Sequence, residues 1–366
     1  MRDFANNEIE PIAAQIDEEE RVPLGIVKKM ADLGLCGIPF PEEYGGSGGG
    51  EIELCIVAEE VSRVCAAIGG ILLVSSGVAG IPIYEFGTEE QRKRFVTPIA
   101  TGEKLAAFAL TEASAGSDAA ALETTATRKD DGYLLNGTKT FITSGPEADF
   151  ALVFATLDKS LGYRGITAFI VEKETPGFSV GKIEHKLGMR ASSTAELVFE
   201  DCFVPEENRL GKEGEGFRIA IGAIDASRLT VAAQAVGIAQ VAFEKSLEYA
   251  KERVQFGRPI ASFQAIQWFL ADMATQIDAA RLLTYRGAYL QGKGLPFVKE
   301  AAMAKVFASE VAMWVTNKAI QIHGGYGYVK DYPLERYFRD AKVTEIYEGT
   351  SEMQRLTIAR ALIGKI

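Results

Sequence analysis

Hydrophobic residues return at steps of three and four over the first hundred positions, which is the period of a helix packed on one side. Pro23 and Thr88 stand where two of these segments begin, and Gly34 stands where one ends. The pattern predicts an all-helical first domain over residues 1–104. Its helices are expected at 4–16, 23–34, 52–64, 67–78 and 88–95.

At about Ala106 the period changes to two, in short runs rich in Val, Ile, Thr and Phe. Turn sequences such as Asn136-Gly137 lie between or beside these runs. Short strands at this spacing predict a compact β-barrel or sandwich over residues 105–211. The strands are expected at 105–110, 123–129, 133–139, 150–156, 166–172, 178–182 and 195–204.

From about Gly211 the helical period returns and continues to the end, with Ala-rich and Leu-rich faces. Helices are expected at 216–252, 263–292, 296–322 and 353–363, which predicts a four-helix bundle over residues 212–366. The third segment, with Phe307 and Trp314, is expected to be wholly buried, as in a bundle inside an oligomer. The fold class is therefore α+β, with a helical domain, a β-domain and a helical bundle in that order.

The 366 residues are 47% hydrophobic, which is typical of a soluble globular protein. The net charge is −11 and no basic stripe is present, so nucleic acid is not expected as the main partner. The first ten residues include Arg2, Asp3 and Glu8, which is typical of neither a signal peptide nor a transit peptide and indicates a cytoplasmic protein. Glycines interrupt the apolar stretch 68–83, and no stretch is expected to span a membrane.

Four cysteines and two histidines are present, with no CxxC pair, so no metal site is expected and the cysteines are predicted to be buried reduced thiols. His323 has no metal-ligand partner at helical spacing and is interpreted as structural. The chain also lacks GxGxxG after a strand, GxxxxGK[ST], HExxH and a Ser/His/Asp set. Nicotinamide, nucleoside triphosphate and zinc chemistries therefore lose support.

A candidate general base is Glu348, which stands between Tyr347 and Gly349. The aromatic ring would exclude water and raise the pKa of the carboxyl group, while the glycine would let another chain or ligand approach the backbone. The alternative is a helix-to-loop junction with Gly349 as C-cap and Glu348 solvated. On these residues alone the alternative is favoured.

Two segments near strand ends could contact a planar ligand. Residues 108–118 read FALTEASAGSD, a loop of small residues whose N–H groups suit a ring edge or a phosphate. Residues 141–145 read FITSG, in which an aromatic residue near a β-branched hydroxyl could flank a ring. Ordinary strand-to-turn connections explain both segments equally well or better.

Three further segments carry residues that could contact a ligand or that have a simpler structural explanation. Asp225 and Arg228 are spaced for a salt bridge within one helix. Residues 253–257 (RVQFG) with Gln264 suit a pyrophosphate or simple capping. Residues 321–327 (QIHGGYG) permit close backbone approach, which a helix stop would also explain.

Taken together, the order and spacing of TEASAGSD, FITSG, KLGMRAS at 186–192, RVQFG, QIHGGYG and RDAKVTEIYEGTSE resemble the acyl-CoA dehydrogenase family of flavoproteins, of short- or medium-chain type, along nearly the whole chain. The resemblance implies a helical, a β and a second helical domain. It also implies FAD at a subunit interface, a homotetramer built as a dimer of dimers, and an electron-transferring flavoprotein as acceptor.

The resemblance assigns site residues by matching motifs. Those expected to line the flavin are Phe108, Leu110, Thr111, Gly116, Ser117, Phe141, Ile142 and Thr143. Those expected to hold the pyrophosphate and adenosine of a neighbouring subunit's FAD are Arg253, Phe256, Gln264, Gln321, Ile322, His323, Gly324 and Gly325. Further FAD contacts are expected at Thr350, Ser351 and Glu352, and substrate contacts at Ser117, Asp225, Arg228, Tyr347 and Gly349.

Glu348 matches the catalytic base of the family, which takes the α-proton of an acyl-CoA while hydride leaves Cβ for flavin N5 and a trans-2-enoyl-CoA forms. In some relatives the base comes from the position that aligns with Ser227, where serine cannot serve. Relatives acting on glutaryl-CoA carry an arginine near the position of Gly69, so a dicarboxylate substrate is not expected.

Relatives usually have more helix before the segment that begins at Met1, so the chain looks shortened. The lack of residues after Ile366 argues against very-long-chain dehydrogenases and acyl-CoA oxidases. The sequence thus predicts an FAD-dependent short- to medium-chain acyl-CoA dehydrogenase of fatty acid or amino acid catabolism. A flavin oxidase or monooxygenase of the same fold, and a non-catalytic CoA-binding scaffold, are the alternatives.

Overall fold

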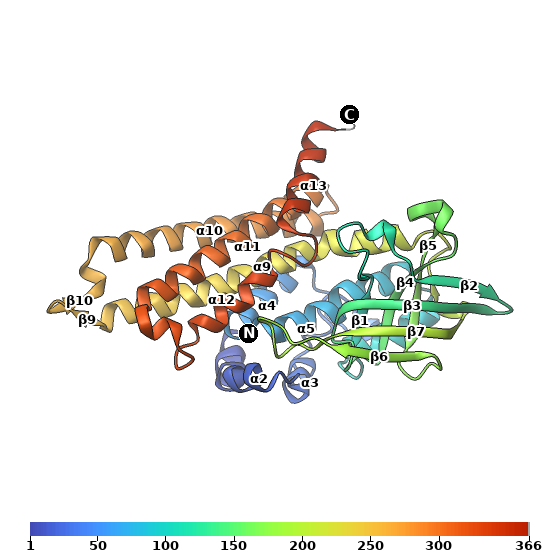
Figure 1. Cartoon of the computed structure of the whole chain (residues 1–366), viewed down its shortest axis with the longest axis horizontal. Coiled ribbons are helices and arrows are strands. Elements are labelled where there is room, and N and C mark those ends of the chain that lie inside the picture. The colour runs from blue at the N-terminus through green and yellow to red at the C-terminus, as the bar shows by residue number, and fades with distance from the viewer. Residues whose placement is uncertain (365–366) are drawn as a thin grey trace.

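The computed structural model describes residues 1–364, as helices, then strands, then helices again. The first helical part ends at Ala100, the main strands lie between Ala106 and Leu210, and the second helical part begins at Gly216. The expected boundaries at 104/105 and 211/212 fall in the two connecting segments. In Figure 1 the β-domain lies at one end of the molecule, and the long helices of the second helical part extend towards the other end.

The α-helices of the first helical part are mostly short, and the longest runs over 14 residues from Glu51 to Val64. They are α1 (Arg2–Phe4), α2 (Ala13–Glu19), α3 (Leu24–Asp32), α4 (Glu51–Val64), α5 (Ala66–Leu72), α6 (Ile81–Phe86), α7 (Glu89–Gln91) and α8 (Thr97–Ala100). Thr88 caps α7 as expected, since its hydroxyl accepts from Gln91 N at 3.2 Å.

The apolar stretch at residues 68–83 lies within a longer helix than expected. A π-helical segment (Leu73–Gly80) joins α5 to α6, so helix runs from Ala66 to Phe86 despite its glycines. This helix and α9 (Gly216–Glu252) are long and apolar enough to cross a membrane, contrary to the prediction that no stretch is. Their most apolar windows are 83% and 72% buried inside the protein, as in the core helices of a folded domain.

The β-domain is one sheet that closes into two facing halves. Its strands are β1 (Ala106–Ala109), β2 (Thr125–Lys129), β3 (Gly132–Thr143), β4 (Phe150–Thr156), β5 (Ile166–Glu172), β6 (Phe178–Ile183), β7 (Thr194–Pro205) and β8 (Arg209–Leu210). The strand order is β6-β7-β3-β2-β4-β5-β8, with β1 parallel to β4.

Within residues 1–364 the two halves are joined by strand pairing only where Thr125 of β2 pairs with Thr156 of β4. Side chains from both halves share one core, in which Leu135 and Phe199 belong to the same cluster as Val153. The predicted compact β-domain is therefore confirmed, and its layers are two halves of a single sheet.

Every residue of β4 is buried because the strand is covered on both faces. Alternate residues such as Phe150 face the first helical part, where the rings of Phe150 and Phe95 lie 5.0 Å apart, and Val153 faces the other half of the sheet. This double covering explains why the sequence of β4 is a continuous apolar run.

Among the described residues, the second helical part contains five α-helices. They are α9 (Gly216–Glu252), α10 (Gln264–Gly292), α11 (Val298–His323), α12 (Leu334–Val343) and α13 (Ser351–Ile363). A small hairpin of β9 (Val254–Gln255) and β10 (Arg258–Pro259) connects α9 to α10.

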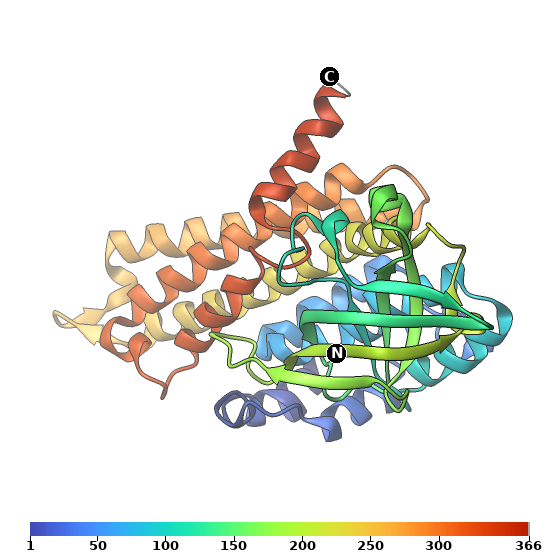
Figure 2. The same cartoon turned by 45° about the vertical axis from the view of Figure 1, so that its right-hand side comes forward.

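The four helices predicted over residues 212–366 are present as α9, α10, α11 and α13, and a further helix, α12, lies between α11 and α13 in the sequence. Helix α12 was not predicted, because its buried face includes the charged residues Arg336 and Asp340 and so hides the apolar period. Helix α4 of the first part shares the core of α9 to α12, whereas α13 projects away from the body (Figures 1 and 2). Residues Phe307 and Trp314 of α11 are half-buried in the single chain, so this helix is not wholly buried.

Candidate functional site

The turn that carries Glu348 lies between the end of α12 at Val343 and the start of α13 at Ser351. Glu348 has φ +52° and Gly349 has φ +89°, so two successive residues are left-handed. The φ of Gly349 favours glycine, because a residue with a side chain would be strained in this conformation. The interpretation of Gly349 as a helix C-cap was wrong, since the helix has already ended.

The Glu348 side chain turns towards α9 and is half-buried. Ser227 Oγ donates a hydrogen bond of 2.9 Å to Glu348 Oε2. Burial raises the pKa of the Glu348 carboxyl, while the Ser227 hydrogen bond and the charges of Lys305 and Arg228 act in the opposite direction. The alternative of a fully solvated surface carboxylate was therefore wrong.

Three side chains donate to the backbone carbonyl groups of this turn. Glu348 O accepts from Arg228 Nε at 3.4 Å and from Gln354 Nε2 at 3.0 Å. Gly349 O accepts from Gln354 Nε2 at 2.8 Å and from Lys305 Nζ at 2.7 Å. Within residues 1–364 no hydrogen bond uses the Glu348 N–H, which leaves this donor available to a substrate carbonyl oxygen.

Arg228 also forms the salt bridge expected within α9, with 2.5 Å between its Nη1 and Asp225 Oδ1. The Arg228 guanidinium thus forms the expected helical salt bridge with Asp225 and also reaches the backbone of the Glu348 turn. Lys305 and Gln354 were missed by the sequence reasoning. A lysine between Ala304 and Val306 on an apolar helix is the signal that could have singled out Lys305.

Tyr347 closes the site on the side of the first helical part. Its hydroxyl donates to Gln234 Oε1, and Gln234 Nε2 donates to Ala66 O at 2.9 Å. Burial raises the pKa of Tyr347, so its hydroxyl stays neutral. A Cβ on Gly69 would lie 2.3 Å from Ser62 Oγ, so a larger residue there would require the Ser62 hydroxyl to move.

The two strand-end segments lie side by side. Thr140 N donates to Thr111 O at 2.8 Å, which joins the FALTEASAGSD loop to the strand that leads into FITSG. A buried ion pair fixes the start of the loop, with 2.7 Å between Lys139 Nζ and Glu112 Oε1 and 3.1 Å between Lys139 Nζ and Leu110 O. Gly116 and Ser117 are exposed farther along the loop.

Phe141 is 64% exposed and has φ +57°, at an irregularity in the pairing of β3 with β7. Left-handed geometry at an aromatic residue is strained and typical of a functional position. Thr143 is half-buried, whereas the side chain of Ile142 is in the core, so only its backbone could contact a ligand. Phe108 is half-buried and Leu110 is buried, so the loop presents few apolar side chains of its own.

Hydrogen bonds connect this surface to α12, the helix that precedes the turn of Glu348. Ser144 N donates to Ser193 O at 2.9 Å, beside the KLGMRAS segment, and Met189 N donates to Asp340 Oδ1 of α12 at 2.6 Å. The hydroxyl groups of Thr140 and Ser144 are buried without a partner among the described residues. Such orphaned donors beside an exposed ring fit a polar, planar ligand such as a flavin.

The third group of predicted residues gathers elsewhere. Arg253, Ile322, His323, Gly324 and Gly325 line a cavity of about 600 Å³ between the end of α9 and the end of α11. In Figure 1 the β9–β10 hairpin, next to this cavity, lies at the end of the bundle remote from the sheet.

Individual members of this group differ in accessibility. Phe256 is 93% exposed with φ +53°, and Gln264 and Gln321 are exposed too. His323 is buried, and its ring stacks on Tyr249 at 4.2 Å, as its structural interpretation predicts. Residues Thr350, Ser351 and Glu352 lie at the start of α13, where the Thr350 hydroxyl accepts from Met353 N at 3.4 Å.

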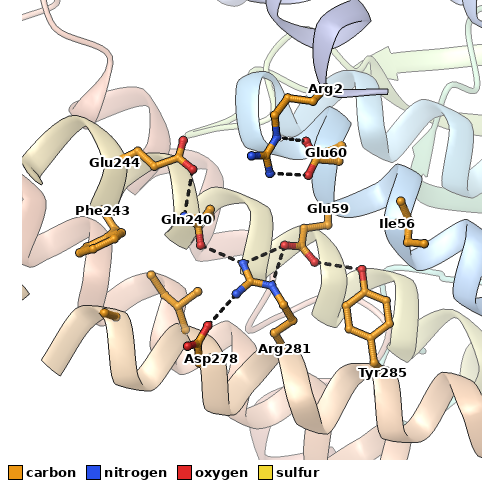
Figure 3. Close-up of a pocket in the computed structure, with 12 residues that line it drawn as sticks. Arg2, Ile56, Glu59, Glu60, Gln240, Phe243, Glu244, Asp278, Arg281 and Tyr285 are labelled. Carbon is orange, nitrogen blue, oxygen red and sulfur yellow. Dashed lines mark hydrogen bonds and ion pairs between the residues drawn. The ribbon is translucent and has the colours of Figure 1, made fainter. Parts of the chain in front are cut away.

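A further cavity of about 520 Å³ between α4, α9 and α10 contains none of the predicted residues (Figure 3). There Arg281 donates to Glu59 Oε1 at 2.9 Å, to Gln240 at 2.8 Å and to Asp278 at 2.9 Å, and Tyr285 donates to Glu59 Oε2 at 3.1 Å. These side chains satisfy one another's hydrogen-bonding groups. We therefore interpret the lining of this cavity as a structural network that connects the helices.

Comparison with known families gives matches over nearly the whole chain. Residues 1–103 match the N-terminal domain of acyl-CoA dehydrogenases, residues 107–202 the middle domain, and residues 214–363 the C-terminal domain.

Individual proteins are similar over the same extent. The short-chain specific acyl-CoA dehydrogenase of Clostridium acetobutylicum is 53% identical over 359 residues, which are 98% of this chain and 95% of that protein. Butyryl-CoA dehydrogenase from Megasphaera elsdenii is 47% identical, with a TM-score of 0.97 over 99% of this chain and 96% of that chain. A chain in the structure described as electron transferring flavoprotein of Acidaminococcus fermentans is 52% identical, with a TM-score of 0.98 over 100% of this chain and 96% of that chain.

Proposed function

Because this chain belongs to the acyl-CoA dehydrogenase family, we propose that it oxidises a short-chain acyl-CoA to the trans-2-enoyl-CoA, with Glu348 as the base that removes the α-proton. The similarity to a short-chain specific dehydrogenase and to butyryl-CoA dehydrogenase supports a substrate with a short acyl chain, such as butyryl-CoA. The observation that carries the proposal is the half-buried Glu348 carboxylate, held against Ser227 in a left-handed turn.

The chemical need for this environment is clear. The α-proton of a thioester is a very weak acid, and a solvated carboxylate is too weak a base to remove it. Partial burial raises the pKa of Glu348 and so makes its carboxylate a stronger base. The free N–H of Glu348 would donate to the thioester oxygen and stabilise the enolate that forms as the proton leaves.

FAD is the proposed cofactor. The exposed ring of Phe141, the half-buried Thr143 and the loop with Gly116 and Ser117 would line the flavin, and the orphaned hydroxyl of Thr140 lies beside them. Bound FAD would supply the acceptor for the hydride that leaves Cβ. Ser117, Asp225 and Arg228 are proposed to contact the substrate.

The distribution of the predicted FAD residues supports an oligomer. The cavity with Arg253 and Gly324 lies at the end of the bundle remote from the β-domain, and a cofactor on the β-domain could then meet this cavity only in a second copy. The exposed side chains of Phe256 and Gln264 are available for such a contact. The proposed assembly is a homotetramer made as a dimer of dimers, with an electron-transferring flavoprotein as acceptor and a cytoplasmic location.

The test is an anaerobic titration of the FAD-loaded protein with straight, branched and cyclic acyl-CoAs, followed by flavin absorbance. Bleaching by butyryl-CoA and its neighbours is the expected result. Rapid oxygen consumption on turnover in air would instead favour an oxidase or monooxygenase. Tight acyl-CoA binding without bleaching by any compound would favour a non-catalytic scaffold and overturn the proposal.

A further inference from the structure

Lys305 is a buried lysine in the middle of α11, with 0% of its surface exposed. Its ammonium group donates to Gly349 O at 2.7 Å, and no ion pair to a carboxylate involves Lys305 among residues 1–364. Burying a charge without a counter-ion is unfavourable. A lysine in this position therefore calls for a role that an apolar side chain could not fill.

The charged groups that face Lys305 come from three elements. Glu348 and Glu345 lie on the turn, Glu352 is at the start of α13, and Arg228 of α9 is paired with Asp225. Burial lowers the pKa of Lys305 to about 8, with Arg228 acting in the same direction and the three glutamates opposing it. The carboxylates around the turn, among them the proposed base, thus favour the ammonium form and oppose the effect of burial.

The turn needs to be held from outside. Glu348 is a non-glycine residue at φ +52°, a strained conformation that persists only where its surroundings fix it. Gln354 also donates to Gly349 O, but it belongs to the helix that directly follows the turn. Lys305 ties the same carbonyl to α11, a core helix.

We propose that Lys305 is a positioning residue for the base: its ammonium group holds the Gly349 carbonyl and so keeps Glu348 directed at Ser227 and at the α-carbon of the substrate. This inference rests on the proposed role of Glu348. As the pH rises and the ammonium group loses its proton, the hydrogen bond weakens and the positive charge near Glu348 disappears. The rate of proton abstraction then falls, which gives the pH profile a basic limb that belongs to Lys305.

The experiment measures the anaerobic rate of flavin reduction by butyryl-CoA against pH in the full-length FAD-loaded protein. The wild type is expected to lose rate above a pH of about 8. Lys305→Met should be slower by about ten- to a hundredfold at neutral pH and should lack this basic limb. Its acidic limb should lie at higher pH, because a positive charge that favours the Glu348 carboxylate is gone.

Lys299→Met is the matched control, since Lys299 lies on the same helix and its ammonium group, on the protein surface, pairs with Glu300 at 3.2 Å. This variant should keep the wild-type rate and profile. A Lys305→Met protein with the wild-type basic limb would overturn the inference.

A second measurement does not depend on turnover or on the variant folding. Backbone hydrogen exchange of residues 345–350, corrected for the intrinsic effect of pH, is compared in the wild type at pH of about 7 and about 9.5. Loss of protection at the higher pH is expected, and unchanged protection would overturn the inference. If no acyl-CoA bleaches the flavin but protection of residues 345–350 is lost at the higher pH, the proposed function fails while the positioning role stands. If turnover is normal, Lys305→Met keeps the basic limb and protection does not change with pH, the positioning role alone is refuted.

Discussion

Ser227 Oγ lies 2.9 Å from Glu348 Oε2 and donates a hydrogen bond to it, which joins helix α9 to the turn of the base. The same hydroxyl lies 3.0 Å from Ile224 O, so its single proton has two possible acceptors. When Glu348 is ionised the carboxylate is the stronger acceptor. Ser227, which aligns with the position expected to carry the base in some relatives, here donates to the proposed base Glu348 on another segment.

Ser227→Ala should make the enzyme more sensitive to acid. Loss of the hydrogen bond disfavours the carboxylate, so the pKa of Glu348 rises further above its ordinary value and the acidic limb of the rate profile moves to higher pH. On this limb the rate should fall about tenfold, which corresponds to about 1.4 kcal/mol. Flavin reduction followed from acidic to neutral pH is the measurement, and Ser227→Thr should keep the wild-type limb. Equal profiles for all three proteins would show that the hydrogen bond has no influence on the base.

Glu348→Gln should remove catalysis and leave binding intact. The amide has the shape of the carboxylate but cannot accept the α-proton, and loss of a general base slows a reaction by about 100- to 10,000-fold. Stopped-flow flavin reduction gives the rate, and equilibrium titration gives the affinity for acyl-CoA. Glu43→Gln, at an exposed position of the first helical part, is the control and should remain active. A Glu348→Gln protein that kept most of its activity would place the base elsewhere.

Arg253→Ala should weaken both FAD retention and subunit association, because the cavity that Arg253 lines is proposed to receive the FAD of a neighbouring subunit. Two equilibria that stabilise the same state are linked. Flavin content after gel filtration and the molar mass of the eluted protein are the measurements. Lys251→Ala, which changes an exposed charge near the end of the same helix, should affect neither. A monomeric Arg253→Ala protein with a full complement of FAD would contradict the linkage.

Lys139→Met should destabilise the protein by about 3–5 kcal/mol, because it leaves the buried carboxylate of Glu112 without its ion-pair partner. The Glu112→Gln/Lys139→Met double variant removes both charges and should recover most of this loss. Urea unfolding gives the free energies. If the single and double variants were equally unstable, the loss would come from packing and not from an unpaired charge.

Glu51→Gln should stabilise the protein at alkaline pH only. Burial raises the pKa of Glu51 to about 8 in the folded state, above its value in the unfolded chain. Because the folded state favours the protonated carboxyl, stability is lost as the pH rises from the unfolded pKa of about 4.5 to about 8. The variant should have a higher Tm at a pH of about 8.5 by several degrees and an unchanged Tm at a pH of about 5. The exposed Glu43 provides the control, and a Glu51→Gln gain that did not depend on pH would exclude titration as the cause.

Local patterns in the sequence determined much of this protein. The helical and strand periods placed nearly all the long elements, since a helix or strand that buries one face must repeat its apolar residues at that period. The segments around Phe141, Glu348 and Gly324 were also singled out, because glycine, aromatic and small hydroxyl residues stand in an order that resembles one family. Helix α12 was not predicted from the sequence, because Arg336 and Asp340 lie on its buried face and hide its apolar period.

The tertiary structure decided how these segments meet. That Ser227 faces Glu348, that Lys305 holds the next carbonyl and that Tyr347 reaches Gln234 depends on contacts between residues 44 to 121 positions apart. No local period encodes such distances, because each pair is set by the packing of α9 and α11 against the turn. The sequence thus specified which residues could do chemistry, and only the packing of distant helices fixed their geometry and the pKa of the base.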